Sequence, residues 1–232
     1  PEALMDLYQG LVLSPFQELR QAALYGVKRC AQPDTHVLIT NALVDEEPSI
    51  RHLAATLLED VLCPQHKDQL RVVLDALDRE QEESTRLALL RGLLCLVDGS
   101  PADRLLVLEL QPLLKHTKSG ENKLALQILK RLRLGPSASL SSDTLRILKV
   151  TTDADTYFAC VTLLGDVLIH EKYEEALHDL AHGLIRFSAA SLQDCTYELM
   201  LRLADEETIN ALLQQIHSRA RLTTSAEVPT VS

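Results

Sequence analysis

Two histidines stand four residues apart in the segment Leu177-His-Asp-Leu-Ala-His-Gly, a spacing that places two imidazoles on one face of a helix. With Glu174 one turn earlier, His178 and His182 are the candidate zinc ligands of this chain. A zinc protease helix needs a Glu after its first histidine, but Asp179 stands there. A full apolar stripe also lies beside the pair. We therefore interpret the two histidines as the flank of a packed helix, and the sequence predicts no metal and no cofactor.

Other patterns typical of catalysis are missing from the sequence. It contains no GxSxG nucleophile elbow, no P-loop and no GxGxxG, and its eight glycines are not clustered as a phosphate-binding loop requires. The cysteines are odd in number, widely spaced and form no CxxC, which indicates small buried residues in a reducing cytosol. They are Cys30, Cys63, Cys95, Cys160 and Cys195. These observations predict a cytoplasmic chain that is not an enzyme.

Charged residues are distributed unevenly between neighbouring parts of the sequence. The region from residue 45 to residue 83 is rich in Asp and Glu, whereas the region around 103–134 is locally basic. One hypothesis is a charge gradient that orients a charged partner. The other is a set of solvated faces with cations at helix C-termini. The candidate partner-binding patch consists of Lys115, Lys118, Lys123, Lys130, Arg131 and Arg133.

Composition limits the fold and the partner. Of the 232 residues, 46% are hydrophobic but only 3% are aromatic and none is Trp, so the core must consist mainly of Leu, Ala, Val and Ile. This composition favours helices packed on helices. The net charge of -10 disfavours binding to nucleic acid and to anionic membranes. No apolar run reaches the roughly 18 residues of a membrane span. The partner that remains is another protein.

The stretch from Val44 to Leu62 shows how the chain is organised. Residues 45–48 form a polar break, and Pro48 suits the first turn of a helix because a missing N–H costs nothing there. From Ile50 onward the apolar residues follow the i, i+3, i+4, i+7 spacing of one buried stripe. Similar segments predict helices at 2–13, 15–30, 34–44, 48–62, 67–77, 82–97, 103–115, 121–134, 142–150, 153–170, 173–187, 191–203 and 206–219.

The second helix of each early pair has a cation followed by small or apolar residues. These cations are Arg20, Arg51, Arg86 and Lys123, at intervals of 31, 35 and 37 residues. Recurrence of one helical hairpin at this period is typical of a solenoid, in which each hairpin buries its apolar face only by stacking on the next. The sequence thus predicts an all-α, superhelical α-solenoid of about six antiparallel helix pairs.

Four segments are expected along the chain. Residues 1–134 form regular repeats, and 135–142 form a linker-like turn rich in Ser, Pro and Gly. Residues 143–222 continue the stack less regularly, and 223–232 lack periodicity, as a disordered tail or a linker does. Because the chain begins with Pro1 rather than Met, we expect it to be a segment of a larger protein.

The order of residues from Val44 to Ala55 resembles the HEAT-repeat signature, in which an acidic turn residue precedes a Pro, a β-branched residue, an Arg and paired alanines. Asp45 and Arg51 stand six apart, as the ladder-forming Asp and Arg of that family do. The resemblance implies a row of hydrogen-bonded ion pairs running from repeat to repeat. The residues six before Arg20, Arg86 and Lys123 are Ser14, Glu80 and Thr117, so the Asp–Arg match is good in this repeat only.

The HEAT resemblance, which covers roughly residues 1–134, implies a scaffold for protein interaction, because such repeats specify an architecture more than an activity. An alternative is a cytoplasmic regulatory domain of a nucleotide-transporter-like membrane protein. A further alternative is a HEAT-like enzyme, either a DNA glycosylase or a chromophore lyase. The acidic charge and the lack of Trp disfavour the glycosylase, which needs a basic surface and an aromatic pocket.

Overall fold

The computed structural model describes residues 2–30, 32, 34–99, 106–115 and 119–225. These residues form thirteen α-helices joined by turns and short 3₁₀ segments, and they contain no β-strand. The chain divides into two compact units, Pro1–Leu132 and Arg133–Ser232. The predicted all-α repeat architecture is confirmed: the described residues contain six consecutive helix pairs followed by one further helix.

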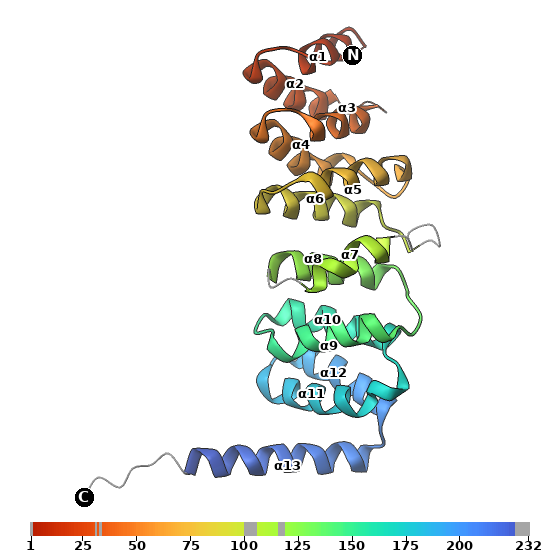
Figure 1. The fold of residues 1–232 in the computed structure, drawn as a ribbon, viewed down its shortest axis with the longest axis vertical. Coiled ribbons are helices and arrows are strands. Elements are labelled where there is room, and N and C mark those ends of the chain that lie inside the picture. Colours follow the sequence, from red (N-terminus) through yellow and green to blue (C-terminus); the bar gives the residue numbers. More distant parts are fainter. Residues whose placement is uncertain (1, 31, 33, 100–105, 116–118, 226–232) are drawn as a thin grey trace, which may run out of the picture. The chain divides into compact units, whose positions relative to one another are not determined.

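Four helix pairs build the first unit, and Figure 1 shows them succeeding one another in chain order. The second helices of successive pairs pack directly on one another, α2 on α4, α4 on α6 and α6 on α8. The helices are α1 (Glu2–Val12), α2 (Gln17–Cys30), α3 (Thr35–Asn41), α4 (Pro48–Val61), α5 (Leu70–Arg79), α6 (Glu83–Leu96), α7 (Leu106–Lys115) and α8 (Ser119–Arg131).

Helix α4 illustrates why the repeats stack. Pro48 occupies its first turn, where no backbone N–H is needed. The predicted apolar stripe is buried, and Ala54 and Ala55 are fully enclosed. Small residues allow neighbouring helices to approach closely: a side-chain carbon added at Gly92 of α6 would lie 2.7 Å from the end of Leu58 on α4. This close packing keeps consecutive second helices in contact.

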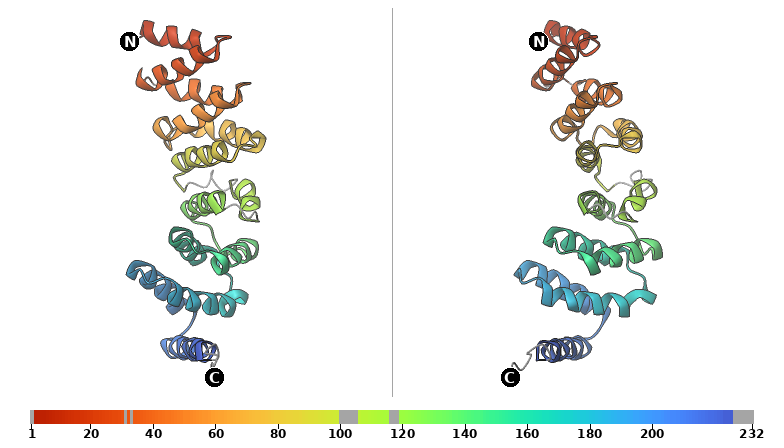
Figure 2. Two further views of the ribbon diagram at one scale, coloured as in Figure 1. Left: turned by 90° about the vertical axis from the view of Figure 1, so that its left-hand side faces the viewer. Right: turned by 60° about the vertical axis from the view of Figure 1, so that its left-hand side comes forward.

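The second unit contains α9 (Ala138–Val150), α10 (Ala154–Val167), α11 (Tyr173–Arg186), α12 (Ala190–Leu203) and α13 (Glu206–Ser225). Figure 2 shows these helices in successive layers, with α10 against α12 and α11 against both α9 and α13. Tyr157 lies at the centre of this core, where its hydroxyl accepts a hydrogen bond from Thr196 and its ring packs over Gly183.

Two predicted boundaries need correction. Helix α9 begins at Ala138, inside the predicted linker 135–142, because the Ser137 side chain accepts a hydrogen bond from the Leu140 N–H and caps the helix. Helix α13 continues through Ser225, so the first part of the predicted tail 223–232 is helical. Residues 226–232 of that tail lie outside the described residues. None of the helices in the described ranges has both the length and the hydropathy required to cross a membrane.

Candidate functional site

Arg20 forms the first of a series of three arginine–carboxylate pairs that recur from one described repeat of the first unit to the next. Its guanidinium donates to the Ser14 carbonyl at 2.9 Å, six residues earlier in its own repeat. It also contacts both carboxylate oxygens of Asp45 in the next repeat, at 2.8 and 2.9 Å. The Arg20 side chain is 7% exposed, so this charge is neutralised almost out of contact with water.

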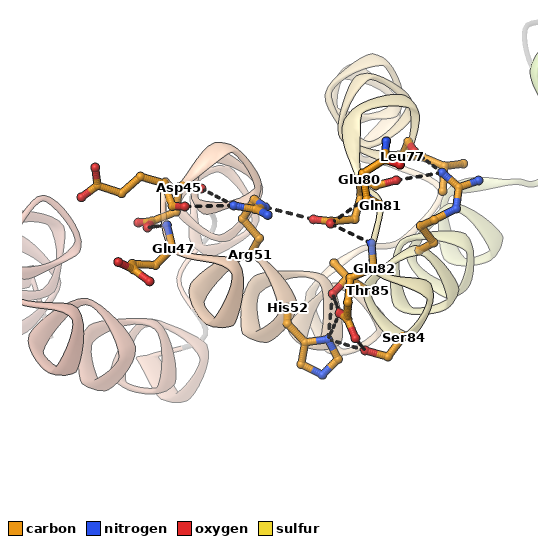
Figure 3. Close-up of polar contacts among 12 residues, drawn as sticks. Asp45, Glu47, Arg51, His52, Leu77, Glu80, Gln81, Glu82, Ser84 and Thr85 are labelled. Carbon is orange, nitrogen blue, oxygen red and sulfur yellow. Dashed lines mark hydrogen bonds and ion pairs between the residues drawn. The ribbon is translucent and has the colours of Figure 1, made fainter.

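Arg51 repeats the arrangement one step further along the stack, as Figure 3 shows. Its guanidinium donates to the backbone carbonyls of Asp45 and Glu46, at 3.0 and 3.1 Å. Its Nε donates to the Glu80 carboxylate at 2.9 Å. That carboxylate also accepts the backbone N–H groups of Gln81 and Glu82, at 2.9 and 3.1 Å. One carboxylate therefore fixes both its own loop and helix α4 of the preceding repeat.

Arg86 provides the third ion pair. It donates to the carbonyls of Leu77 and Glu80, at 2.7 and 3.1 Å, and forms a two-pronged contact with the Glu121 carboxylate at 2.8 and 3.1 Å. The Glu121 side chain is 2% exposed. The hydrogen bond from the carboxylate raises the Arg86 pKa above its ordinary value, against the opposing effect of burial. Paired geometry of this kind is the strongest form of Arg–carboxylate contact.

These pairs form a ladder, a name we keep for Arg20–Asp45, Arg51–Glu80 and Arg86–Glu121. Each arginine binds a carbonyl six residues earlier and a carboxylate of the following repeat. The sequence signature is complete in one repeat only, yet the row of ion pairs continues through all three arginines. The spacing rule misses the third pair because Glu121 lies in the first turn of α8 and not in the loop before it.

The pKa of Glu80 reflects its place in the ladder. Burial alone would raise it, but the hydrogen bond from Arg51, the two backbone donors and the guanidinium charge together lower it below its ordinary value of 4.5. The carboxylate is thus held ionised at neutral pH. An ionised, almost fully buried Glu80 is a structural element that binds its own chain, and it is not available as an acid or base for a substrate.

The ladder arginines occupy equivalent positions on α2, α4 and α6. Residues at a fixed distance after each arginine are therefore equivalent on the three helices. Five residues after each ladder arginine stand Tyr25, Thr56 and Arg91, all of them exposed. We call these three residues the second-helix row. At the start of the same helices, His52 of α4 contacts Ser84 and Thr85 of α6, at 3.2 and 3.0 Å. The exposed face therefore carries equivalent positions on consecutive helices.

The basic residues of the candidate partner-binding patch do not all fall within one described surface. Lys115, Lys123, Lys130 and Arg131 belong to α7 and α8, whereas Arg133 belongs to the second unit, and Lys118 lies outside the described residues. Arg131 donates to the Leu94 carbonyl at 2.6 Å, next to the end of α6. This contact is that of a cation at a helix C-terminus. The role of the patch in binding stays a prediction.

The predicted histidine pair lies side by side on α11. The ring centroids of His178 and His182 are 4.6 Å apart and tilted by 57°. Burial and the neighbouring His178 lower the pKa of His182. In the part of the chain that the structure describes, no group of three or more His, Cys, Asp or Glu residues has an arrangement that could hold a metal ion. The geometry provides two rings without a third ligand.

Comparisons with known proteins connect this chain to repeat folds. No protein-family model matches the sequence, and no curated protein matches it significantly. Among solved structures, the designed armadillo repeat protein YIII(Dq)4CqI is similar with a TM-score of 0.67 at 13% identity, over 87% of this chain and 100% of that chain. An engineered protein of the Northeast Structural Genomics Consortium has a TM-score of 0.63 at 14% identity, over 86% and 96% of the two chains.

A third similar structure was solved with a peptide. The designed armadillo repeat protein YIII(Dq.V1)4CPAF, in complex with the peptide (KR)4, has a TM-score of 0.55 at 12% identity, over 91% of this chain and 96% of that chain. At these identities the similarity shows the fold and no more. The fold is an armadillo/HEAT-type helical repeat, as the sequence pattern indicated.

Proposed function

We propose that this chain is a non-catalytic repeat scaffold that binds a segment of another protein along the exposed face of its second helices. The observation that carries the proposal is the ladder, which ties four consecutive repeats together through buried ion pairs. A surface held rigid in this way requires little ordering when a partner binds, and ordering is a major part of the unfavourable free energy of association. Regular spacing also suits an extended partner that repeats its contacts.

The similar designed protein supports this proposal by analogy. A chain of the same fold holds the peptide (KR)4. Such a complex shows that an armadillo-type repeat can function as a binding surface without any catalytic group. Function belongs to the exposed residues rather than to the fold, so the partner of this chain depends on its own second-helix face.

We further propose that this scaffold is one segment of a larger protein in the cytoplasm. All five cysteines are free, and none is paired in a disulfide. Free cysteines that are buried, as Cys160 is, or half-buried, as the other four are, suit a reducing compartment, where they act as small apolar residues. Detection of the full-length product in fractionated cells, with an antibody raised against this segment, tests both parts of the proposal.

Selection of peptides tests the binding function directly. A random peptide library displayed on phage is selected on the whole chain, and enriched peptides are then measured by fluorescence anisotropy against variants. The variant Thr56→Lys with Arg91→Glu alters the second-helix row and changes the net charge by −1. Arg71→Ala, on the exposed side of α5, changes the net charge equally and serves as the matched control.

The proposal predicts that enriched peptides bind the row variant about tenfold more weakly, since a few central contacts supply most of the affinity of an interface. The control is expected to bind within about twofold of the original chain. Enrichment of no peptide above background, or equal weakening by both variants, would contradict a binding role for the second-helix face.

A further inference from the structure

A groove lies between α11 and α13 in the second unit, apart from the second-helix row. Its volume is about 720 Å³, and it also receives residues from α9 and from the 3₁₀ segment His170–Lys172 before α11. Pockets that bind small molecules have volumes of about 300–1,000 Å³. The groove is therefore large enough to receive a segment of a partner.

The lining of the groove carries an excess of negative charge. Four carboxylates border it, those of Glu171, Glu174, Glu175 and Asp179, against the one ammonium of Lys149. The Lys149 ammonium donates to Glu175 at 2.8 Å, and Lys172 pairs with the other oxygen of that carboxylate at 2.7 Å. Among the described residues, neither Glu171 nor Glu174 has an ion-pair partner. The charge that remains is negative.

The burial of Asp179 supports a binding site in the groove independently of the excess negative charge. Its side chain is 9% exposed, and its Oδ2 atom accepts no hydrogen bond from the described residues. The Lys149 ammonium forms an ion pair with Oδ2 at 3.4 Å, a longer contact than its 2.8 Å hydrogen bond to Glu175. Burial raises the Asp179 pKa, and the nearby Lys149 only partly opposes this effect. Because Lys149 reaches Oδ2 only through this long contact, a closer donor entering from the groove would stabilise the buried carboxylate.

Apolar residues flank the charged part of the groove. Leu177 of α11 and Leu212 of α13 line it, and both are partly exposed. Long cationic side chains lay their methylene groups along apolar surface while the charged end reaches a carboxylate. Arginine fits better than lysine because its planar guanidinium can bind a carboxylate through two parallel hydrogen bonds.

We propose that the groove between α11 and α13 binds an arginine-containing basic segment of a partner protein, whose guanidinium reaches Asp179 and Glu174 between Leu177 and Leu212. The inference rests on the proposed function in taking the partner to be a protein. It adds a second contact site that is separate from the second-helix row, and it assigns the chemistry of the segment bound there.

Anisotropy titrations of the whole chain with two labelled peptides test the proposal. One peptide alternates arginine with leucine, and the other replaces every arginine by glutamate. The groove variant Glu174→Gln with Asp179→Asn removes two negative charges. Asp6→Asn with Glu18→Gln removes two exposed carboxylates from α1 and α2 and is the matched control. Titrations are done at physiological ionic strength, where attraction between distant exposed charges is screened.

The arginine peptide is expected to bind the original chain and the control within about twofold of each other, and to bind the groove variant at least about tenfold more weakly. Because Asp179 is buried, Glu174→Arg provides a second variant at an exposed position and is expected to weaken binding by a similar factor. The glutamate peptide is not expected to bind.

Equal weakening in the groove variant and the control would show general charge attraction and would overturn the proposal. The same conclusion follows if the glutamate peptide binds as well, or if Glu174→Arg has no effect. Sedimentation that shows self-association lost in Glu174→Arg would assign the groove to a second copy of the chain, which also overturns it. Phage peptides that depend only on the second-helix row would refute this inference while leaving the proposed function intact.

Discussion

Replacement of Glu80 by alanine removes the middle carboxylate of the ladder. The side chain is 7% exposed and accepts three hydrogen bonds, one from Arg51 and two from backbone N–H groups. Without it, the two backbone donors and a guanidinium that is 26% exposed lose their acceptor. Helices α4 and α6 would then be joined by apolar packing without this polar contact.

The free energy of unfolding should fall by about 3 kcal/mol in Glu80→Ala. Loss of one partner of a buried ion pair costs about 3–5 kcal/mol. The lower end applies here because Arg51 is partly open to water and keeps the carbonyls of Asp45 and Glu46. Glu80→Gln retains an oxygen for the backbone donors and loses the charge alone, so its expected cost is about 1.5–2 kcal/mol.

The pH dependence of stability provides a second signature of the same residue. Because the folded-state pKa of Glu80 lies below its ordinary value of 4.5, its ionised form stabilises the fold above that value. This contribution is lost as the pH falls through the lowered folded-state pKa. The original chain should therefore lose more stability than Glu80→Gln between about pH 5 and about pH 3.

Urea denaturation followed by circular dichroism measures these changes. Glu59→Ala, an exposed carboxylate of α4, is the control and should change the free energy of unfolding by less than about 0.5 kcal/mol. If Glu80→Ala proved as harmless as this control, or if Glu80→Gln lost stability in acid as steeply as the original chain, the ion pair with Arg51 would not hold the repeats together.

Two further predictions concern packing and capping in the second unit. In Gly183→Ala the added carbon would lie 2.0 Å from the buried Tyr157 hydroxyl, so we expect a loss of about 1–3 kcal/mol in urea denaturation. Gly10→Ala, where nothing lies within 4 Å, should gain about 0.5–1 kcal/mol, and an equal effect of both changes would contradict the packing argument. Asp153→Ala removes the carboxylate that accepts the Thr156 N–H at 2.8 Å, so the free energy of unfolding should fall by about 1 kcal/mol. Hydrogen exchange should become faster only in the first turn of α10. Unchanged exchange there would contradict the capping role of Asp153.

Local chemistry explains why the helices could be predicted from the sequence. Pro48 and the stripe from Ile50 onward define α4 without reference to any other part of the chain. The start of α9 is harder to predict, because a segment rich in Ser, Pro and Gly is typical of a linker, although Ser137 is a good N-cap residue.

The partners within the ladder could not be predicted from spacing within one repeat. The sequence predicts Asp45 and Arg51 as ladder residues, but in the structure each pairs with a residue of a different neighbouring repeat. Loop lengths vary, so the distance along the chain from arginine to carboxylate differs at every step. A useful signal would have been the need of a buried arginine for a carboxylate in the next repeat, which indicates Glu80 and Glu121.

The groove around Asp179 depends even more on distant parts of the chain. The carboxylate is on α11, and the opposite wall is on α13, whose docking is set by buried Ile209 and Ile216. Periodicity predicts that α13 is amphipathic but does not specify which helix it packs against. The spacing of His178 and His182 is visible in the sequence, whereas the burial of Asp179 is set by packing and cannot be seen there.

A double-mutant cycle on Arg86 and Glu121 tests the ladder most directly, because this pair was not evident from the sequence pattern. The single variants Arg86→Met and Glu121→Gln and the double variant are compared by urea denaturation. The ladder predicts a coupling energy of about 1.5 kcal/mol or more, as expected for a buried two-pronged ion pair. Effects that add within about 0.5 kcal/mol would contradict the claim that these pairs join one repeat to the next.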